Sequence, residues 1–499
     1  MSVQDQQVES KEPDRTGIFD GDRYPWIAMG VVLIGTFMVI LDTTIVNVAL
    51  PQIGLALDRQ AGIEWVVTAY LLAVGLAQPP TGWLADRFGR KRLFIVSLGF
   101  FVIGSLGAAL SPNLGSLVGA RVIQGLGGGA LMPVGMAMIY ELFPPHRRGT
   151  ALGVWGVAAM AGPAFGPVIG GYLVTNVSWH WLFLINVPIG VVGIIIASKL
   201  LRDTGYSERR RFDGIGLALI SAGLVVWLFT FAKADVWGWD SALSVTLLVL
   251  GALLVTLFVL WERRVDHPAI DVSMFGVPIF SLTLAVIACT VVVQFGILVF
   301  LPLELETIRG MTALRVGTML VPTAIAAAIT FPLGGRLTDR IGPRVPVVTG
   351  VLLLGVSAWI LGHLTLESPT LTIEIALVAQ GLGFGLAMMP NSVTGLNALP
   401  KRFVAQATAV RQLNVRVAAS FGVAVLAGVV STAMGDATPT GPGDPGAAAG
   451  QAAYNQMFLI LSGLALVAGL LAVFLPGKER NRQIQAERAE EYQPAIPEM

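Results

Sequence analysis

Two ionisable residues interrupt long apolar stretches in the first third of the sequence. Asp42 lies in the apolar stretch 26–50, and Arg121 lies in the stretch 115–140. An ionised side chain at the centre of a bilayer costs about 2.5–3.5 kcal/mol, so each of these residues needs a specific role. At about 1.5 Å per helical residue, Asp42 lies roughly 12 Å and Arg121 roughly 9 Å below the same membrane surface. The two side chains can therefore interact if their helices are neighbours.

Such a pair suits reversible protonation. Burial favours the neutral form of a carboxyl group, whereas a nearby guanidinium favours the charged form. If the hydration of Asp42 and its distance from Arg121 change between two conformations, the site can load and release a proton. The alternative is a permanently ionised pair that only fixes the packing of two helices.

A second group of charges lies in a short polar segment that occurs twice. The first copy is Gly82-Trp-Leu-Ala-Asp86-Arg87-Phe-Gly89-Arg90, and the second is Gly335-Arg-Leu-Thr-Asp339-Arg340-Ile-Gly342-Pro343, 253 residues later. Acidic and basic side chains around a glycine turn could pair across two halves of the protein and latch one side closed. The alternative is that they only set membrane topology and cap helices. Pro343 replaces the equivalent of Arg90, which predicts a weaker latch in the second copy.

The stretches that carry these residues have the length of membrane spans, since about 20 apolar residues cross a bilayer. Only 13% of the 499 residues are charged and 55% are hydrophobic, too few charges for the surface of a soluble protein of this size. We therefore expect an all-α polytopic membrane protein with about fourteen spans. They lie near 26–50, 64–84, 93–111, 115–140, 149–174, 181–200, 213–232, 241–261, 279–303, 314–337, 345–365, 370–398, 404–433 and 454–475.

The distribution of Lys and Arg sets the orientation. With the N-terminus inside, 25 of the 32 basic residues lie in cytoplasmic segments and only four lie in outer loops. This asymmetry predicts that both termini are cytoplasmic and that the number of spans is even. The polar N-terminus does not resemble a signal peptide.

Several classes of function are disfavoured. Cys289 is the only cysteine and the four histidines are scattered, so neither a disulfide framework nor a metal site is expected. The glycine run 125–129 lacks the Lys-Ser/Thr ending of a phosphate loop, and the net charge of +1 does not favour nucleic acid. Because no nucleophile–base pair is evident either, we expect no cofactor, no nucleotide and no enzymatic activity.

A second repeat pairs Gln124-Gly-Leu-Gly-Gly-Gly129 with Gln380-Gly-Leu-Gly-Phe-Gly385 at an offset of 256 residues. The chain thus contains two homologous halves of parallel topology, with substrate expected between them near the midplane. The predicted organisation is a cytoplasmic tail (1–25), a six-helix bundle (26–205), two additional spans (206–270), a second six-helix bundle (271–475) with a flexible outer loop (434–453), and a cytoplasmic tail (476–499).

Five motifs, in order, resemble those of the fourteen-helix drug:proton antiporters of the major facilitator superfamily. They are Leu41-Asp42-Thr-Thr-Ile-Val-Asn47-Val-Ala-Leu-Pro51, the loop Gly82–Arg92, Arg121-Val-Ile-Gln124-Gly125, Gly162-Pro163-Ala-Phe-Gly166-Pro167-Val-Ile-Gly170-Gly171, and Trp179-His-Trp-Leu-Phe-Leu-Ile-Asn186-Val-Pro-Ile-Gly190. The fourth resembles the antiporter motif of that branch. From the residues alone, its glycines and prolines predict tight, kinked helix packing.

The resemblance implies proton-driven export of hydrophobic or amphiphilic compounds, as in multidrug efflux and antibiotic resistance. The protein is then a monomer in a bacterial inner membrane, with protons, small amphiphiles and the lipid bilayer as its partners. Asp42 and Arg121 would couple transport to protons, and the two loop motifs would gate it. We expect a cavity lined by Asn47, Gln124, Met132, Gln294, Met388 and Asn391. The alternatives are a lipid exporter, whose access route the two extra helices would widen, and a proton-coupled metabolite symporter.

Two sites depart from the pattern of the family. Glu304 and Glu306 follow the ninth span, where uncharged residues are usual, and could form an outer acidic site that attracts cations. They could equally form a solvated helix end, with Glu306 paired to Arg309 at i+3. In the thirteenth span, Arg411 matches the branch but Arg416 stands where small residues are usual. Arg416 either lines the cavity or extends to the cytoplasmic face.

Overall fold

The computed structural model describes residues 23–57, 62–144, 147–202, 213–265, 268–435, 444 and 446–490, and its regular elements within these ranges are all helices. Most of the predicted N-terminal tail, the end of the C-terminal tail, and residues 436–443 and 445 of the predicted loop 434–453 lie outside the described residues. The loop was predicted too long, because residues 447–453 form the first turns of α16. The helices are α1 (Tyr24–Ala56), α2 (Trp65–Ala77), α3 (Thr81–Phe88), α4 (Arg90–Ala109), α5 (Leu114–Leu142), α6 (Arg148–Asn176), α7 (Trp181–Leu184), α8 (Asn186–Leu200), α9 (Gly214–Trp237), α10 (Ala242–Glu262), η2 (Val272–Gly276), α11 (Pro278–Thr307), α12 (Ala313–Ile341), α13 (Arg344–Leu361), α14 (Thr370–Asn397), η3 (Lys401–Phe403), α15 (Val404–Met434), α16 (Ala447–Val473) and α17 (Lys478–Glu490).

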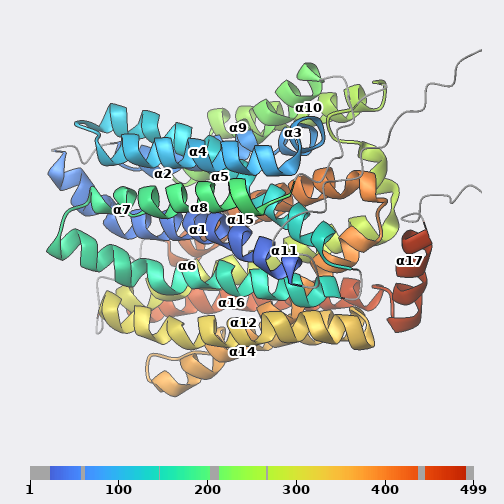
Figure 1. The fold of residues 1–499 in the computed structure, drawn as a ribbon. Helices are drawn as coiled ribbons and strands as arrows, with labels where there is room; N and C mark the ends of the chain where they lie inside the picture. Colours follow the sequence, from blue (N-terminus) through green and yellow to red (C-terminus); the bar gives the residue numbers. More distant parts are fainter. Residues whose placement is uncertain are drawn as a thin grey trace, which may run out of the picture.

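Twelve segments of the described chain are long and apolar enough to cross a membrane. They are α1, α4, α5, α7 together with α8, and each helix from α9 to α16. The other two predicted spans correspond to α2 followed by α3, and to α6 with its 29 residues. A helix of that length measures about 43 Å, enough to cross a bilayer. The predicted fold class, an all-α polytopic membrane protein, is confirmed, and the long helices run side by side in Figure 1.

The predicted span 64–84 is interrupted near its end. Its first part, α2, ends at Ala77, and α3 begins at Thr81. Pro79 and Pro80 lie between them. Because proline has no backbone N–H and its ring clashes with the preceding turn, a helix does not continue through this pair. The first loop motif therefore begins on a separate short helix at the end of the bundle.

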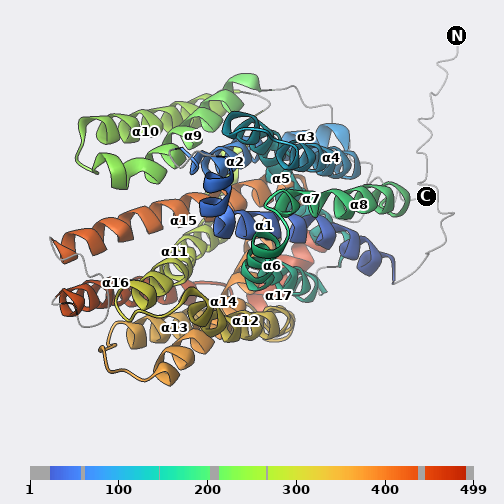
Figure 2. The ribbon, with the colours of Figure 1, turned by 90° about the vertical axis from the view of Figure 1, so that its left-hand side faces the viewer.

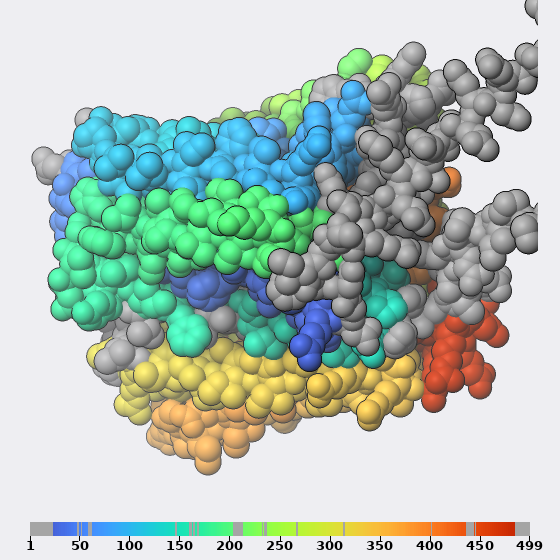
Figure 3. All heavy atoms as spheres, in the orientation of Figure 1, coloured from blue at the N-terminus to red at the C-terminus, as the bar shows by residue number. Residues whose placement is uncertain are grey.

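The chain forms two halves that use the same helix pairings. In the first half α5 contacts α2 and α4, and in the second half α14 makes the equivalent contacts with α12 and α13. Figure 2 shows the yellow, orange and red helices of the second half gathered on one side of the blue-to-green helices of the first. On the face seen in Figure 3, the blue-to-green helices of the first half form an upper layer, and the yellow and orange helices of the second half form a lower layer.

The repeated Gln-Gly motif explains the closest of these pairings. A Cβ atom on Gly125 of α5 would lie 2.6 Å from the carbonyl oxygen of Tyr70 in α2. A Cβ atom on Gly381 of α14 would likewise collide with the carbonyl oxygen of Thr323 in α12. Glycine allows the two backbones to approach this closely. Because both contacts join residues related by the sequence repeat, the two halves repeat one structure.

The two additional spans form a hairpin, in which α9 contacts both α2 of the first half and α15 of the second. Aromatic side chains hold α9 in this seam, where Trp65 lies 5.8 Å from Phe229 and Phe231 lies 5.4 Å from Phe421 between ring centroids. By contrast, α10 has large exposed apolar side chains, among them Val249, which is 63% exposed. Hence α9 fills a seam between the halves, and α10 presents an apolar surface of the kind that faces lipid.

One end of the bundle carries α3, the start of α4 and α17, and we call it the basic end. Here Arg344, at the start of α13, donates a hydrogen bond from Nε to the carbonyl oxygen of Leu475 at 2.7 Å. Leu475 lies just before α17, so this bond holds the start of α17 near the turn between α12 and α13. The turn itself uses Gly342 with φ of 87°, and the matching turn between α3 and α4 uses Gly89 with φ of 84°. Positive φ is readily adopted only by glycine, which explains why both copies of the loop motif have one there.

Candidate functional site

Asp42 and Arg121 form a buried ion pair between α1 and α5. Arg121 Nη1 lies 2.5 Å from Asp42 Oδ2, and both side chains are at most 1% exposed. Asp42 Oδ1 accepts hydrogen bonds from Gln124 Nε2 at 2.8 Å and from Asn186 Nδ2 at 3.0 Å. These bonds to a carboxylate compensate for its removal from water.

The guanidinium of Arg121 is held from several sides. Its Nε donates to the carbonyl oxygen of Val66 at 3.1 Å, and Nη1 donates to Gln124 Oε1 at 2.6 Å. Its Cζ atom lies 4.0 Å from the centroid of the Tyr70 ring, a cation–π contact. Gln124 is fixed in turn by a bond from Nε2 to Ser105 Oγ at 2.7 Å. The site therefore draws side chains from α1, α2, α4, α5 and α8.

Small residues bring these helices together. A Cβ atom on Gly104 of α4 would collide with the backbone nitrogen of Gln124, so glycine is needed where α4 supports the site. Asn186 is the first residue of α8, directly after the short helix α7. Gly190, one turn later, lies against Val102 of α4, which brings the start of α8 towards Asp42.

The glycines of the predicted antiporter motif lie behind Asp42. A Cβ atom on Gly162, Gly166 or Gly170 of α6 would meet Ile40, Thr44 or Ile45 of α1, respectively. Thr44 Oγ1 also donates to the carbonyl oxygen of Gly162 at 3.1 Å. The stripe therefore packs α6 against the turns of α1 that flank Asp42, as tight packing predicts. The side chains of Pro163 and Pro167 lie outside the described residues.

This arrangement ties the charge of Asp42 to a set of buried electrostatic contacts. Asp42 is enclosed, so its carboxylate is stabilised by Arg121 and by the side-chain amides of Gln124 and Asn186 rather than by water. Protonation would remove the charge that Arg121 neutralises and leave a buried cation beside Tyr70. Leaving a buried charge without its partner costs about 3–5 kcal/mol. A structural change that rehydrates or re-pairs Arg121 would recover that free energy.

The first copy of the loop motif lies on α3 and the start of α4, where it contacts α15 of the second half. A Cβ atom on Gly82 would lie 2.9 Å from Gln406 Cγ and 3.1 Å from its Cα. Arg90 is buried and forms an ion pair with Glu141 of α5, so this pair lies within the first half. Asp86 is half-buried and Arg87 is exposed.

The second copy makes the closer contact between the halves. Gly335 of α12 lies against Gly149 of α6 backbone to backbone, and a Cβ atom on either glycine would collide with the carbonyl group of the other. Asp339 Oδ2 accepts a hydrogen bond from Thr150 Oγ1 at 3.2 Å. Arg340 is exposed. The weaker latch predicted from Pro343 stays a prediction, since the contact described here uses backbone atoms of α6 and does not involve position 343.

Three residues that sequence reasoning did not select join the halves at the same end. Asn397 of α14 accepts hydrogen bonds through Oδ1 from Tyr140 Oη at 2.6 Å and from Arg148 Nη1 at 3.1 Å. Arg148 Cζ also lies 3.9 Å from the Tyr140 ring centroid. Together with Gly82 and Gly335, these contacts close the basic end.

At the opposite end, the two glutamates differ. Glu304 is fully buried and its Oε1 lies 3.3 Å from Arg309 Nε, whereas Glu306 is exposed. The predicted pairing of Glu306 with Arg309 was wrong. Arg309 instead turns back towards the bundle, where it also donates to the carbonyl oxygens of Thr365 and Ser368. Glu304 is therefore part of a packed helix end rather than a solvated one.

The described residues expected to line a substrate cavity are buried or partly buried, and two of them form hydrogen bonds within the bundle. Gln124 belongs to the ion-pair network, and Asn391 Nδ2 donates to the carbonyl oxygen of Thr283 at 2.9 Å. Met388 and Gln294 are buried, and Met132 is partly buried against the core. The side chain of Asn47 lies outside the described residues.

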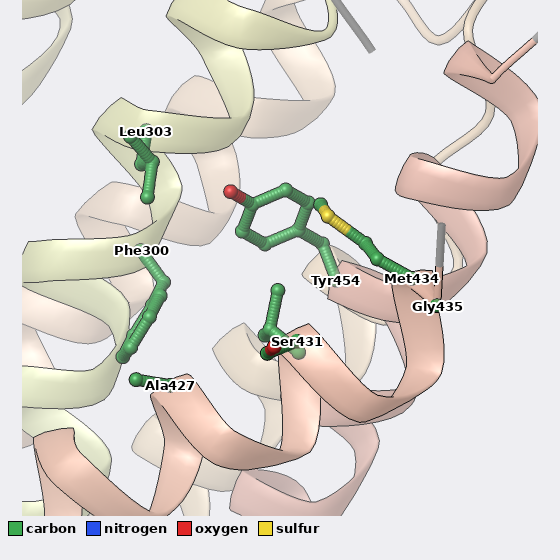
Figure 4. Close-up of a pocket in the computed structure, with 8 residues that line it drawn as sticks. Phe300, Leu303, Ala427, Ser431, Met434, Gly435 and Tyr454 are labelled. Carbon is green, nitrogen blue, oxygen red and sulfur yellow. The ribbon is translucent and has the colours of Figure 1, made fainter. Parts of the chain in front are cut away.

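A pocket of about 290 Å³ lies elsewhere, between α11, α15 and α16 towards the end opposite α17. Figure 4 shows the Tyr454 ring reaching across it. It is lined by Phe300, Leu303, Ala427, Val430, Ser431, Met434, Gly435 and Tyr454. None of the six predicted cavity residues is among them, and that assignment stays a prediction.

Comparison with known proteins agrees with this architecture. The chain is 31% identical over 419 residues to the tetracenomycin C resistance and export protein of Streptomyces glaucescens, covering 83% of this chain and 78% of that protein. It is also 31% identical over 408 residues to a multidrug resistance protein B homolog of Mycobacterium tuberculosis, covering 80% and 74% of the two chains. The structure of the proton:xylose symporter XylE superposes with a TM-score of 0.63 at 14% identity, covering 93% of this chain and 99% of that one.

The match to a family model decides the classification. It extends over residues 32–423, which include most of both halves, the additional hairpin and both loop motifs. The chain is therefore a multi-span membrane protein that belongs to the Major Facilitator Superfamily of transporters.

Proposed function

We propose that this transporter exports small hydrophobic or amphiphilic compounds in exchange for protons. The buried pair of Asp42 and Arg121 carries the proposal, because a membrane-embedded carboxylate that needs a cationic partner is suited to proton loading. The relatives named for drug resistance and export support the class of substrate.

The proposed cycle uses the ion pair as the coupling element. When Asp42 is ionised, it holds α1, α5 and α8 together through Arg121, Gln124 and Asn186. A proton on Asp42 weakens that link and favours the conformation in which Arg121 finds another partner or water. A potential of 100 mV contributes about 2.3 kcal/mol per charge and each pH unit about 1.4 kcal/mol. One proton could therefore support a gradient of roughly a few hundredfold for a neutral compound.

The basic end is proposed to be cytoplasmic, as the Lys and Arg asymmetry indicates. The contacts of Gly335 with Gly149 and of Asn397 with Tyr140 then close the inner side. Export requires these contacts to open for substrate entry and to close again before release outside. Asp339 and Asp86 lie on the helices that must separate, which supports the proposed gating role of the loop motif.

Two other functions compete with this proposal. A lipid exporter would gain from a lateral opening between the halves, but α9 fills the seam between α2 and α15 and so disfavours that route. A proton-coupled symporter would use the same ion pair and move substrate in the opposite direction. The direction of pH-driven flux separates symport from antiport.

The test is transport in proteoliposomes with an imposed pH gradient and a panel of amphiphilic dyes and antibiotics. Antiport predicts that a compound moves against the direction of proton flow, accumulates above equilibrium, and loses this accumulation when an ionophore collapses the gradient. Accumulation in the direction of proton flow would instead establish symport. A protein that moves no member of the panel under either polarity would contradict export of this class of compounds.

A further inference from the structure

The helix α15 carries two arginines whose charges the described protein does not neutralise. Arg121 is paired with Asp42, and Arg309 is paired with Glu304. In contrast, neither Arg411 nor Arg416 has a carboxylate oxygen within 4.0 Å among the residues that the structure describes.

Arg411 lies between the two halves. It is 3% exposed, its Nε donates to Ser392 Oγ at 2.9 Å, and its Nη1 lies 3.3 Å from the sulfur of Met136 in the first half. Both partners are neutral. These contacts fix the position of the guanidinium but leave its charge uncompensated.

Arg416 lies farther along α15. It is partly exposed and close enough to Tyr70 of α2 for the two groups to interact electrostatically. The Tyr70 ring packs against Arg121 on one side, and its hydroxyl is buried without a hydrogen-bond partner. Among the described residues Arg416 itself forms no hydrogen bond or ion pair. Helix packing alone therefore does not explain why an arginine stands at this position.

The buried guanidinium of Arg411 favours a counter-charge nearby, and the partly exposed Arg416 is the group that such a charge can reach. Arginine does not lose its proton in proteins, so it cannot become neutral when it is buried. An isolated charge away from water is costly unless it is paired. An apolar or cationic ligand would leave this cost in place, whereas an anion would remove it. The planar guanidinium also matches the geometry of a carboxylate, phosphate or sulfonate group.

We propose that the transported compound carries an anionic group, which Arg416 binds opposite Tyr70 while Arg411 supplies positive potential behind it. The substrate class is then an amphiphilic organic anion, such as a hydrophobic carboxylic acid. Arg416 makes the contact because it is accessible, and Arg411 acts through its field because it is enclosed. This inference rests on the proposed transport function.

The test compares three dansyl-labelled amphiphiles of equal chain length: a carboxylic acid, its uncharged amide, and a trimethylammonium. Binding is measured by fluorescence titration of the full-length protein in phosphatidylcholine nanodiscs without a pH gradient. We expect the acid to bind about tenfold to a hundredfold more tightly than the amide, the range for one hydrogen bond to a charged group. Arg416→Gln should remove this preference, and Arg416→Lys should restore part of it. The exposed Arg315→Gln serves as the matched control and should keep the full preference.

Equal binding of the acid and the amide by the unmodified protein would overturn the proposal, as would tighter binding of the trimethylammonium. An acid preference that survives Arg416→Gln would also overturn it. Repeating the titration in phosphatidylglycerol nanodiscs tests the source of the anion. Loss of acid binding there would assign the site to a lipid headgroup instead of a transported compound.

The proposed function is tested separately by pH-driven flux of whichever probe binds. Selective acid binding without proton-driven export would leave the anion site standing and contradict antiport. Proton-driven export of the trimethylammonium, with no preference for the acid, would support antiport and contradict the anion site.

Discussion

The two halves of the protein place different chemistry at equivalent positions of one architecture. In the first half, Arg121 and Gln124 of α5 bind Asp42 of α1. In the second half, the residues 256 positions later are Leu377 and Gln380. There Gln380 Nε2 lies 3.5 Å from the carbonyl oxygen of Gln294 in α11, a long and weak hydrogen bond.

This difference indicates what the ion pair is for. The helix pairings of the two halves match, and glycines hold α14 against α12 just as they hold α5 against α2. The fold therefore does not require an ion pair at this position. Buried ion pairs are often no more stabilising than apolar residues of similar volume. The proposed role of Asp42 and Arg121 in charge chemistry would then assign proton handling to the first half.

Removal of the Asp42 carboxyl group should have the largest effect on proton-coupled transport. Asp42→Asn keeps the size of the side chain but has no proton to exchange. We expect accumulation of substrate against its gradient to be lost, whereas exchange without a pH gradient survives. The measurement is paired uptake with and without the gradient, with the exposed Asp240→Asn as control. Uphill accumulation equal to that of the unmodified protein would place the proton site elsewhere.

The two glutamines of the repeat offer a matched pair. Gln124→Ala removes bonds to Asp42, Arg121 and Ser105. Asp42 and Arg121 keep each other, but the buried hydroxyl of Ser105 loses its partner, at a cost of about 1–3 kcal/mol. Gln380→Ala removes one long bond. We expect a clear fall in thermal stability and in coupled transport only for the first. Thermal unfolding and pH-driven flux measure these effects. Similar losses in both variants would mean that both halves contribute to proton coupling.

The two copies of the loop motif can be compared through their glycines. Gly335→Ala would drive a methyl group into the backbone of Gly149, whereas Gly82→Ala would meet Gln406, whose side chain can move in part. We expect Gly335→Ala to open the basic end more. Spin labels on the exposed positions Phe88 and Ile341, in a Cys289→Ala background, report the distance between the halves. A greater increase in Gly82→Ala would reverse the ranking of the two contacts.

The smallest effect is expected at Glu304. This buried carboxylate of the second half already has Arg309 as its partner and lies at the end opposite the basic end. Glu304→Gln should lower thermal stability while the coupling of transport to protons stays intact, and the exposed Glu306→Gln should change neither. Loss of pH-driven accumulation in Glu304→Gln would show that proton handling is not confined to the first half.

Much of the fold could be predicted because its determinants are local. Span length, the asymmetry of Lys and Arg and the two repeated motifs predicted the helices and their organisation into halves. The break at Pro79 and Pro80 was also visible in the sequence, although the span 64–84 was predicted as continuous. Asp42 and Arg121 stood out because charges are rare in apolar stretches.

The partners of these residues were harder to predict. Ser105 and Tyr70 are ordinary residues in their helices, and only the packing of α4 and α2 against α5 brings them to the site. Asn186 lay within a recognised motif, but the direction of its side chain towards Asp42 depends on the junction between α7 and α8. The ion pair of Arg309 likewise depended on a turn beyond the helix end, which reverses the side chain towards Glu304 and away from Glu306.

The contact of Gly149 with Gly335 has a consequence for how this protein can evolve. Both residues are already the smallest available, and the atoms that touch belong to the backbone. A larger residue on one side therefore cannot be rescued by a smaller residue on the other. Pairs that compensate for each other leave correlated changes in sequences, and this pair has no compensating change to offer. We expect a contact that closes the transporter to leave no trace of covariation among its relatives.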